Sequence, residues 1–236
     1  MLTGAAATGC SDKESTSGSN YSSADASVSD EITTGEDSET NSTSSSDTGS
    51  ANLANMDLTY TDRDLDANRS TSGATSITLK SSSISVSGSG ASVSGAVVTI
   101  QSAGTYTVSG TLSNGQIIVA AGEQDKVQLV FNGVNITCSN HAPIYIKSAD
   151  KVFITLTAGT SNSITDGSSY SLSEADSAVD GAVFSKEDLT INGTGALTVK
   201  ANYQHGIVSK DDLVITGGVY NLSLIHISEP TRPRLI

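Results

Sequence analysis

Ser185-Lys-Glu-Asp-Leu-Thr-Ile191 is followed 24 residues later by a near copy of itself, Ser209-Lys-Asp-Asp-Leu-Val-Ile215. An earlier pair has the same form, because Asp125-Lys-Val-Gln-Leu129 recurs 25 residues later as Asp150-Lys-Val-Phe-Ile154. The step between the two pairs, from Val152 to Leu189, is longer and fits one period plus a polar insertion around residues 161–180. A repeat of this length indicates a solenoid, in which every period is one supersecondary unit.

Each period contains three short apolar runs, most of them alternating with polar residues, separated by Gly, Asn, Asp and Ser. Leu189/Ile191, Leu197/Val199 and Ile207/Val208 form one such set, before Leu213/Ile215 begins the next. Alternation predicts strands that bury one face. Three strands in 24–25 residues predict an all-β fold, a parallel β-helix whose equivalent strands stack about 4.8 Å apart. A β-sandwich would not repeat its side chains in register at this spacing.

Composition limits the classes of function. The chain has 236 residues and a net charge of −13, which argues against binding of nucleic acid or anionic lipid, since both require a basic surface. Aromatic residues make up 4% and Trp is absent, so the core must come from Val, Ile and Leu.

The two ends of the chain differ from the repeats. Residues 1–10 are small and apolar up to Cys10 and resemble the end of a bacterial lipoprotein signal peptide, although an ordinary small-residue N-terminus is the alternative. Residues 11–53 are rich in Ser, Thr and acids and predict a disordered tether. Residues 222–236 resemble translated sequencing-library adapter. We therefore expect an incomplete β-helix domain over 54–221, truncated at its C-terminus.

Several motifs of the repeat region also resemble a known protein family. They are Thr99–Val119, Val127–Thr137, Asn162–Gly167 and the paired Ser-Lys-[Glu/Asp]-Asp-Leu segments. The family comprises secreted or lipid-anchored bacterial carbohydrate-binding proteins that are right-handed parallel β-helices. The resemblance implies a polysaccharide-lyase-like fold, bound calcium, and binding of cellulose or acidic pectic chains such as polygalacturonate.

One column of the repeat is acidic, and it suggests a metal site. Aligning the equivalent strands stacks Asp125, Asp150, Glu187 and Asp211. The lysines that follow Asp125 and Asp150 favour a solvated turn there. At Glu187, Asp188, Asp211 and Asp212 the acids outnumber the lysines, and carboxylates at this spacing suit Ca²⁺. A ladder of solvated acids remains an equal alternative.

Sugar contacts are expected from tyrosine and lysine side chains. Tyr145 lies between Ile144 and Ile146, so it points outward if they point inward, and Tyr170 lies in the insertion. The candidate binding residues are Tyr145, Tyr170, Tyr203, Lys186 and Lys210, the two lysines being placed to meet the carboxylates of an acidic polysaccharide. Packing of each tyrosine against a coil edge is the structural alternative.

Catalysis has weaker support. A β-eliminating lyase requires a basic residue at the reacting carbon, and residues 70–221 contain no arginine, although Lys186 or Lys210 could serve. The sequence therefore predicts a cell-surface, lipid-anchored protein that binds plant cell-wall polysaccharide with the help of calcium. A polygalacturonate lyase and a structural, adhesin-like stalk remain the alternatives.

Overall fold

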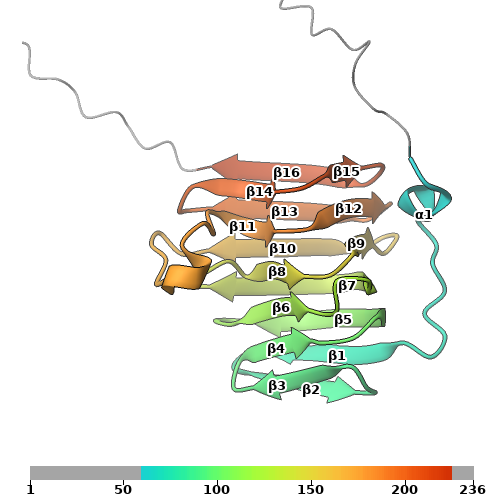
Figure 1. Ribbon diagram of the computed structural model, residues 1–236, viewed down its shortest axis with the longest axis horizontal. Helices are drawn as coiled ribbons and strands as arrows, with labels where there is room; N and C mark the ends of the chain where they lie inside the picture. The colour runs from blue at the N-terminus through green and yellow to red at the C-terminus, as the bar shows by residue number, and fades with distance from the viewer. Residues whose placement is uncertain (1–59, 225–236) are drawn as a thin grey trace, which may run out of the picture. The chain divides into compact units, whose positions relative to one another are not determined.

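The computed structural model describes residues 60–224, and nearly all of their regular structure is β-strand (Figure 1). The expected all-β class is confirmed. The elements are α1 (Asp62–Leu65), β1 (Thr75–Lys80), β2 (Ser83–Ser87), β3 (Ala91–Ser94), β4 (Val97–Ile100), β5 (Gly104–Leu112), β6 (Gln116–Ala120), β7 (Lys126–Cys138), β8 (Ile144–Ser148), β9 (Lys151–Leu156), β10 (Ser161–Asp166), the 3-10 helix η2 (Glu174–Asp176), β11 (Gly181–Ser185), β12 (Asp188–Gly193), β13 (Ala196–Ala201), β14 (His205–Ser209), β15 (Leu213–Ile215) and β16 (Val219–Leu224).

Parallel pairing arranges these strands in three ladders. Ladder 1 contains β1, the first halves of β5 and β7, then β9, β12 and β15. Ladder 2 contains the second halves of β5 and β7, then β10, β13 and β16. Ladder 3 contains β4, β6, β8, β11 and β14. The chain visits the ladders in the order 1, 2, 3 and then begins the next level, as the stacked arrows of Figure 1 show.

The registers match the repeat that is visible in the sequence. Val127 pairs with Val152, Val152 with Leu189, and Leu189 with Leu213. Equivalent residues of successive levels therefore lie above one another, as the alignment of the repeats predicts. The longer second step, from Val152 to Leu189, contains the insertion, which comprises residues 167–180 and joins β10 to β11. The expected insertion began at residue 161, but residues 161–166 form β10.

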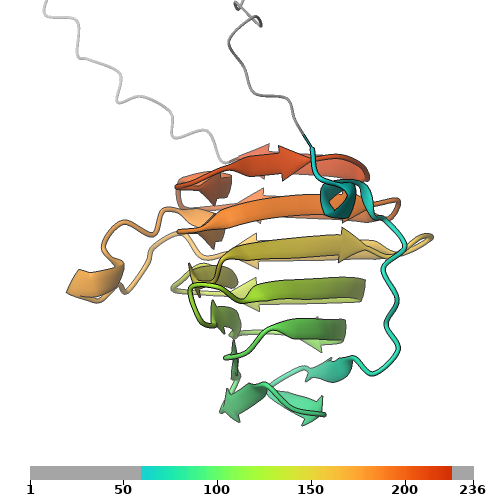
Figure 2. The same cartoon turned by 45° about the vertical axis from the view of Figure 1, so that its right-hand side comes forward.

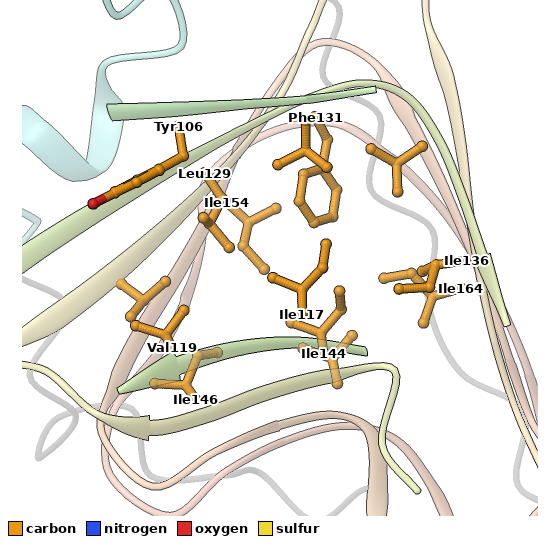
Figure 3. Close-up of a cluster of buried hydrophobic side chains, with 14 of the residues drawn as sticks. Tyr106, Ile117, Val119, Leu129, Phe131, Ile136, Ile144, Ile146, Ile154 and Ile164 are labelled. Carbon is orange, nitrogen blue, oxygen red and sulfur yellow. The ribbon is translucent and has the colours of Figure 1, made fainter. Parts of the chain in front are cut away.

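The interior between the ladders is filled by columns of aliphatic side chains. Figure 3 shows Leu129 and Ile154 of ladder 1, Ile136 of ladder 2 and Ile117 of ladder 3 among side chains that converge on one another. All four are fully buried. Each buried Leu or Ile contributes about 2 kcal/mol relative to an exposed one, so the columns are the main stabilising feature of the fold.

Glycine makes the corner between ladders 1 and 2. Gly110 and Gly193 have positive φ angles of 99° and 102°, which other residues rarely adopt. A Cβ atom at Gly193 would also lie 2.2 Å from the carbonyl oxygen of Leu156, one level below. The two levels can therefore stack closely at this corner only because Gly193 has no side chain.

The ends of the described strands differ from the expected domain limits. Residues 1–59 and 225–236 lie outside the described residues, so the tether over 11–53 and the lipidation of Cys10 are not tested by the structure. The expected boundary at 221 falls within β16, which continues to Leu224 and pairs there with Ala201. None of the helices described within 60–224 is long and apolar enough to cross a membrane.

The segment before β1 packs on the outer side of ladder 1, where α1 contacts β12 (Figure 2). Its anchor is Asp64, whose carboxylate accepts a hydrogen bond from Thr190 at 2.6 Å and lies 2.9 Å from the ammonium of Lys151. Burial alone would raise the pKa of Asp64, but hydrogen bonds from Thr190, Lys151 and Thr61 outweigh it and hold this pKa well below its usual value. The main-chain oxygen of Asp64 accepts from Thr216, next to β15.

We predict that Asp64→Asn lowers the free energy of unfolding by about 3 kcal/mol at neutral pH, because Lys151 would keep a buried position without its counter-charge. The folded-state pKa of Asp64 is depressed, so its contribution is complete above about pH 4 and is lost as the pH falls further. Urea unfolding of Asp64→Asn and of the exposed control Asp62→Asn, at neutral pH and near pH 3, measures this. Equal stability of the two variants at neutral pH would contradict it.

Candidate functional site

The outer side of ladder 3 carries an unusual apolar column. Ile118, Tyr145, Phe184 and Val208 stand at paired positions of β6, β8, β11 and β14. Their neighbours along each strand point into the core, so these strands are apolar on both faces. An apolar column on an outer face requires a cover.

The insertion supplies this cover. Leu172 and Val179 of the insertion pack with Tyr145 and Phe184 in a second hydrophobic cluster, separate from the main core. The hydroxyl of Tyr145 donates a hydrogen bond to Asp176 at 2.6 Å, which ties η2 to β8. In Figures 1 and 2 the insertion projects from the opposite side of the stack to α1.

A cleft of about 450 Å³ lies between the insertion and the outer side of ladder 3. Aromatic and polar side chains combine in its walls, and β4, β6 and β8 each contribute to its floor. The lining residues are Thr99, Gln116, Ile118, Ala120, His141, Tyr145, Lys147, Ser171, Ser173 and Asp176. Such a mixture of ring surface, hydroxyl, amide and charge is suited to a polyhydroxylated ligand.

Three lysines stand in one column beside this cleft. Ser185 pairs with Ile146 on one side and with Ser209 on the other, so the next residues, Lys147, Lys186 and Lys210, occupy equivalent positions on successive levels. Successive levels of parallel strands are about 4.8 Å apart. Lys186 and Lys210 were expected from the sequence to face a ligand together, and the structure adds Lys147 to them.

The insertion partly neutralises the lysine column. The ammonium of Lys147 lies 3.9 Å from Asp176, and that of Lys210 lies 3.5 Å from Asp180. The hydrogen bond from Tyr145 lowers the pKa of Asp176 more than burial raises it, and Ser173, Lys147 and Lys186 lower it further, so Asp176 is a carboxylate at neutral pH. Lys147 and Lys210 thus have carboxylate partners in the insertion, whereas the ammonium of Lys186 lies 5.7 Å from the ring centre of Tyr145.

The three predicted tyrosines lie near one another, but they are not equally accessible. Tyr145 points away from the core as expected, yet it is only 2% exposed because the insertion covers it. It therefore does not form an open platform for a sugar ring, and only part of it lines the cleft. Burial, followed by the hydrogen bond to Asp176, raises the pKa of Tyr145.

Tyr170 and Tyr203 form an aromatic row with His141. The rings of Tyr170 and Tyr203 stack 4.3 Å apart, and the rings of His141 and Tyr170 are nearly parallel at 5.8 Å. The hydroxyl of Tyr170 donates to Asp166 at 2.7 Å, and burial together with this bond raises the pKa of Tyr170. Tyr170 and Tyr203 are each half-buried, so packing and ligand contact are both open to them.

The acids predicted as metal ligands lie where the chain passes from ladder 3 to ladder 1, between β11 and β12 and between β14 and β15. Burial raises the pKa of Glu187, and the charges of Asp211, Glu123 and Asp188 raise it further. The amide of Asp212 donates to the carboxylate of Asp188 at 3.3 Å. Among residues 60–224, no group of three or more His, Cys, Asp or Glu is arranged to hold a metal ion. The side chains as placed do not form a calcium ligand set.

A family model described as "Carbohydrate-binding domain-containing protein" matches residues 94–225, which is more than half of the chain. The chain belongs to this family. The cleft and the lysine column thus lie within the carbohydrate-binding domain.

Relatives of this carbohydrate-binding domain include a protein of the same description from Acetivibrio thermocellus, 47% identical over 122 residues, a match that covers 51% of this chain and 43% of the relative. The solved structure of the polysaccharide lyase-like protein from C. thermocellum, a gadolinium derivative, is similar with a TM-score of 0.61 and 41% identity, covering 63% of this chain and 61% of that one. This chain spans less than two thirds of either protein.

Tyr145→Phe removes the hydroxyl that holds Asp176, so we predict that the insertion opens more readily. A hydrogen bond to a charged group contributes about 1.5 kcal/mol, which corresponds to roughly tenfold faster amide exchange over residues 167–180. Hydrogen-exchange mass spectrometry measures this effect. Tyr220→Phe, in β16 and away from the insertion, is the control, because it loses a hydroxyl that donates to Gly217. Equal exchange of the insertion in both variants would contradict the assignment.

Proposed function

We propose that the chain binds plant cell-wall polysaccharide without cleaving it, and that its preferred ligands are acidic pectic chains held in the cleft beside ladder 3. The observation that carries this proposal is the column of Lys147, Lys186 and Lys210 next to an aromatic and hydroxyl-lined cleft. A carboxylate on successive sugars can meet successive ammonium groups, whereas neutral cellulose gains nothing from them.

The ligand chain would run across the strands, along the direction in which the levels stack. In that direction the lysine column continues past the cleft to β14, so several sugars can be held in a row. Ser171 and Ser173 of the insertion offer hydroxyl groups on the other wall. An extended, shallow site of this kind favours weak and reversible binding.

We infer that the three ladders belong to a right-handed parallel β-helix, a fold in which such exposed rows are a natural binding surface. The parallel registers and the order 1, 2, 3 of the ladders support this. We also propose that Cys10 is lipidated and that residues 11–53 tether the domain at the cell surface. Acid-rich tethers stay extended and would hold the domain away from the membrane.

Binding without cleavage is favoured over a lyase by the position of the basic residues. Arg63 and Arg69, the arginines within residues 60–224, belong to the segment before β1, on the opposite side of the stack from the insertion (Figure 2). Two lysines of the column, Lys147 and Lys210, lie beside carboxylates of the insertion. Their positive charges are suited to binding a negatively charged ligand. A lyase would instead release unsaturated oligosaccharides that absorb ultraviolet light, and we expect no such release when the chain is incubated with polygalacturonate.

The triple variant Lys147→Gln, Lys186→Gln, Lys210→Gln tests the proposal. Exposed ion pairs contribute about 0.5 kcal/mol each, so we predict roughly tenfold weaker binding to polygalacturonate in affinity electrophoresis. Wild-type binding should weaken as salt is raised, because these charges are exposed. Binding to cellulose should change little in the variant.

The matched control is Lys80→Gln with Lys200→Gln, which removes exposed lysines outside the column. Equal loss of polygalacturonate binding in the control would show a nonspecific charge effect and would contradict the site. No binding to any polysaccharide by the wild-type chain would contradict the function itself.

Calcium is a further proposal that rests on repulsion among Glu187, Asp188, Asp211 and Asp212. These side chains would have to rearrange to form a ligand shell, and an ion that binds only the folded state adds about 2.7 kcal/mol at a hundredfold excess over its Kd. We predict a higher Tm in calcium than in EDTA, and no such difference in Asp188→Asn with Asp212→Asn. Glu174→Gln, on η2, is the control. Identical melting in calcium and EDTA would exclude this ion as a stabiliser.

A further inference from the structure

The main chain of Ala142 holds two side chains of the cleft. Its amide N–H donates a hydrogen bond to Nδ1 of His141 at 2.8 Å, and its carbonyl oxygen accepts one from Nε2 of Gln116 at 2.7 Å. Ala142 is fully buried in the second hydrophobic cluster, so both groups have a fixed partner. His141 and Gln116 are half-buried, and both line the cleft beside ladder 3.

These two bonds determine what each side chain offers to a ligand. An amide N–H can only donate, so Nδ1 of His141 carries no proton, and the proton of the neutral ring lies on Nε2. A carbonyl oxygen can only accept, so the amide nitrogen of Gln116 faces Ala142 and Oε1 is left free to accept. Among residues 60–224, neither Nε2 of His141 nor Oε1 of Gln116 has a hydrogen-bond partner. The cleft thus offers one fixed donor and one fixed acceptor.

The surroundings of His141 keep its ring in place and uncharged. The ring centre lies 5.5 Å from that of Tyr145 and 5.8 Å from that of Tyr170, whose ring is nearly parallel to it. Burial lowers the pKa of His141 more than the charge of Asp176 raises it, so the imidazole is neutral at pH 7. His141 is therefore a neutral donor, distinct in chemistry from the lysine column.

We propose that His141 and Gln116 bind two adjacent hydroxyl groups of one sugar ring, and that they disfavour polysaccharide that is O-acetylated at these positions. This inference rests on the proposed function, because it concerns a ligand in the same cleft. Nε2 of His141 donates to one hydroxyl group, and Oε1 of Gln116 accepts from its neighbour. An acetyl ester has no proton to donate, so Oε1 would be left unpaired against the ligand.

The position of the pair fits a 1,4-linked galacturonate ring. Such a ring carries its carboxylate on one edge and its free 2- and 3-hydroxyl groups on the opposite edge. Gln116 is the first residue of β6 and His141 precedes β8, whereas Lys147 lies near the end of β8. Because β6 and β8 are parallel, the pair and Lys147 lie toward opposite ends of the cleft. A ring between them can present its carboxylate to Lys147 and its hydroxyl groups to the pair.

Affinity electrophoresis of the full chain in two polygalacturonates of equal charge tests the pair. One polymer is unmodified and the other is acetylated on its 2- and 3-hydroxyl groups. We expect the wild-type chain to bind the acetylated polymer about tenfold more weakly. His141→Asn keeps an oxygen that can accept from Ala142 but removes the donor at Nε2, and Gln116→Met removes the acceptor. Each variant should bind the unmodified polymer more weakly, and the double variant should bind both polymers equally.

The matched controls are His205→Asn and Gln124→Met, which alter exposed residues outside the cleft lining and should keep the tenfold difference. Thermal melting confirms that every variant folds. Nitrogen-15 NMR spectroscopy of the wild-type chain gives a readout that needs no ligand, and we expect the Nε2–H tautomer of His141 at neutral pH.

The outcomes separate this inference from the proposed function. Equal binding of both polymers by the wild-type chain, with binding still weakened in the triple lysine variant, would overturn the role of the pair and leave the proposed function standing. An Nδ1–H tautomer of His141, or the same loss of discrimination in the controls as in the double variant, would also overturn it. A wild-type chain that binds neither polymer would overturn both.

Discussion

The fold depends on one constraint, the vertical register between equivalent strands of successive levels. Once Val127, Val152, Leu189 and Leu213 are stacked by parallel hydrogen bonding, every other residue of a level is assigned to a column. Inward columns must be aliphatic, corners must tolerate close backbone approach, and outward columns become rows of like side chains. The lysine column is a consequence of this constraint, since Lys147, Lys186 and Lys210 are brought into line only by the register.

The insertion turns one of these outward surfaces into a cleft. The polar insertion could not hold a fixed position alone. The apolar column that contains Tyr145 and Phe184 gives it a surface on which to pack. Asp176 then serves both the insertion, through Tyr145, and the lysine column, through Lys147. On the opposite side, the buried carboxylate of Asp64 holds the segment before β1 to β12 and to Lys151. Two segments outside the ladders are thus fixed by single acidic side chains.

The sequence predicted the repeat, the strand register and the inward residues, because the regular alternation of Val, Ile and Leu states them directly. It did not predict the burial of Tyr145, which depends on Leu172 and Val179 of a segment with no repeat partner. A signal was present, since β8 and β11 are apolar at both alternating positions, and such strands require covering on both faces. The anchoring of Asp64 joins residues more than 120 positions apart and leaves no local pattern beyond its capping box with Thr61.

The proposed function depends on the binding of acidic polysaccharide in the cleft between the insertion and ladder 3. Hydrogen exchange of the full chain, with and without oligogalacturonate, tests this most directly because it locates the ligand without altering a residue. We expect slower exchange of main-chain amides in 141–147 and 171–176, with no change around residues 67–71 on the opposite side. Protection confined to another surface, or a ligand that binds without protecting either of these segments, would contradict it.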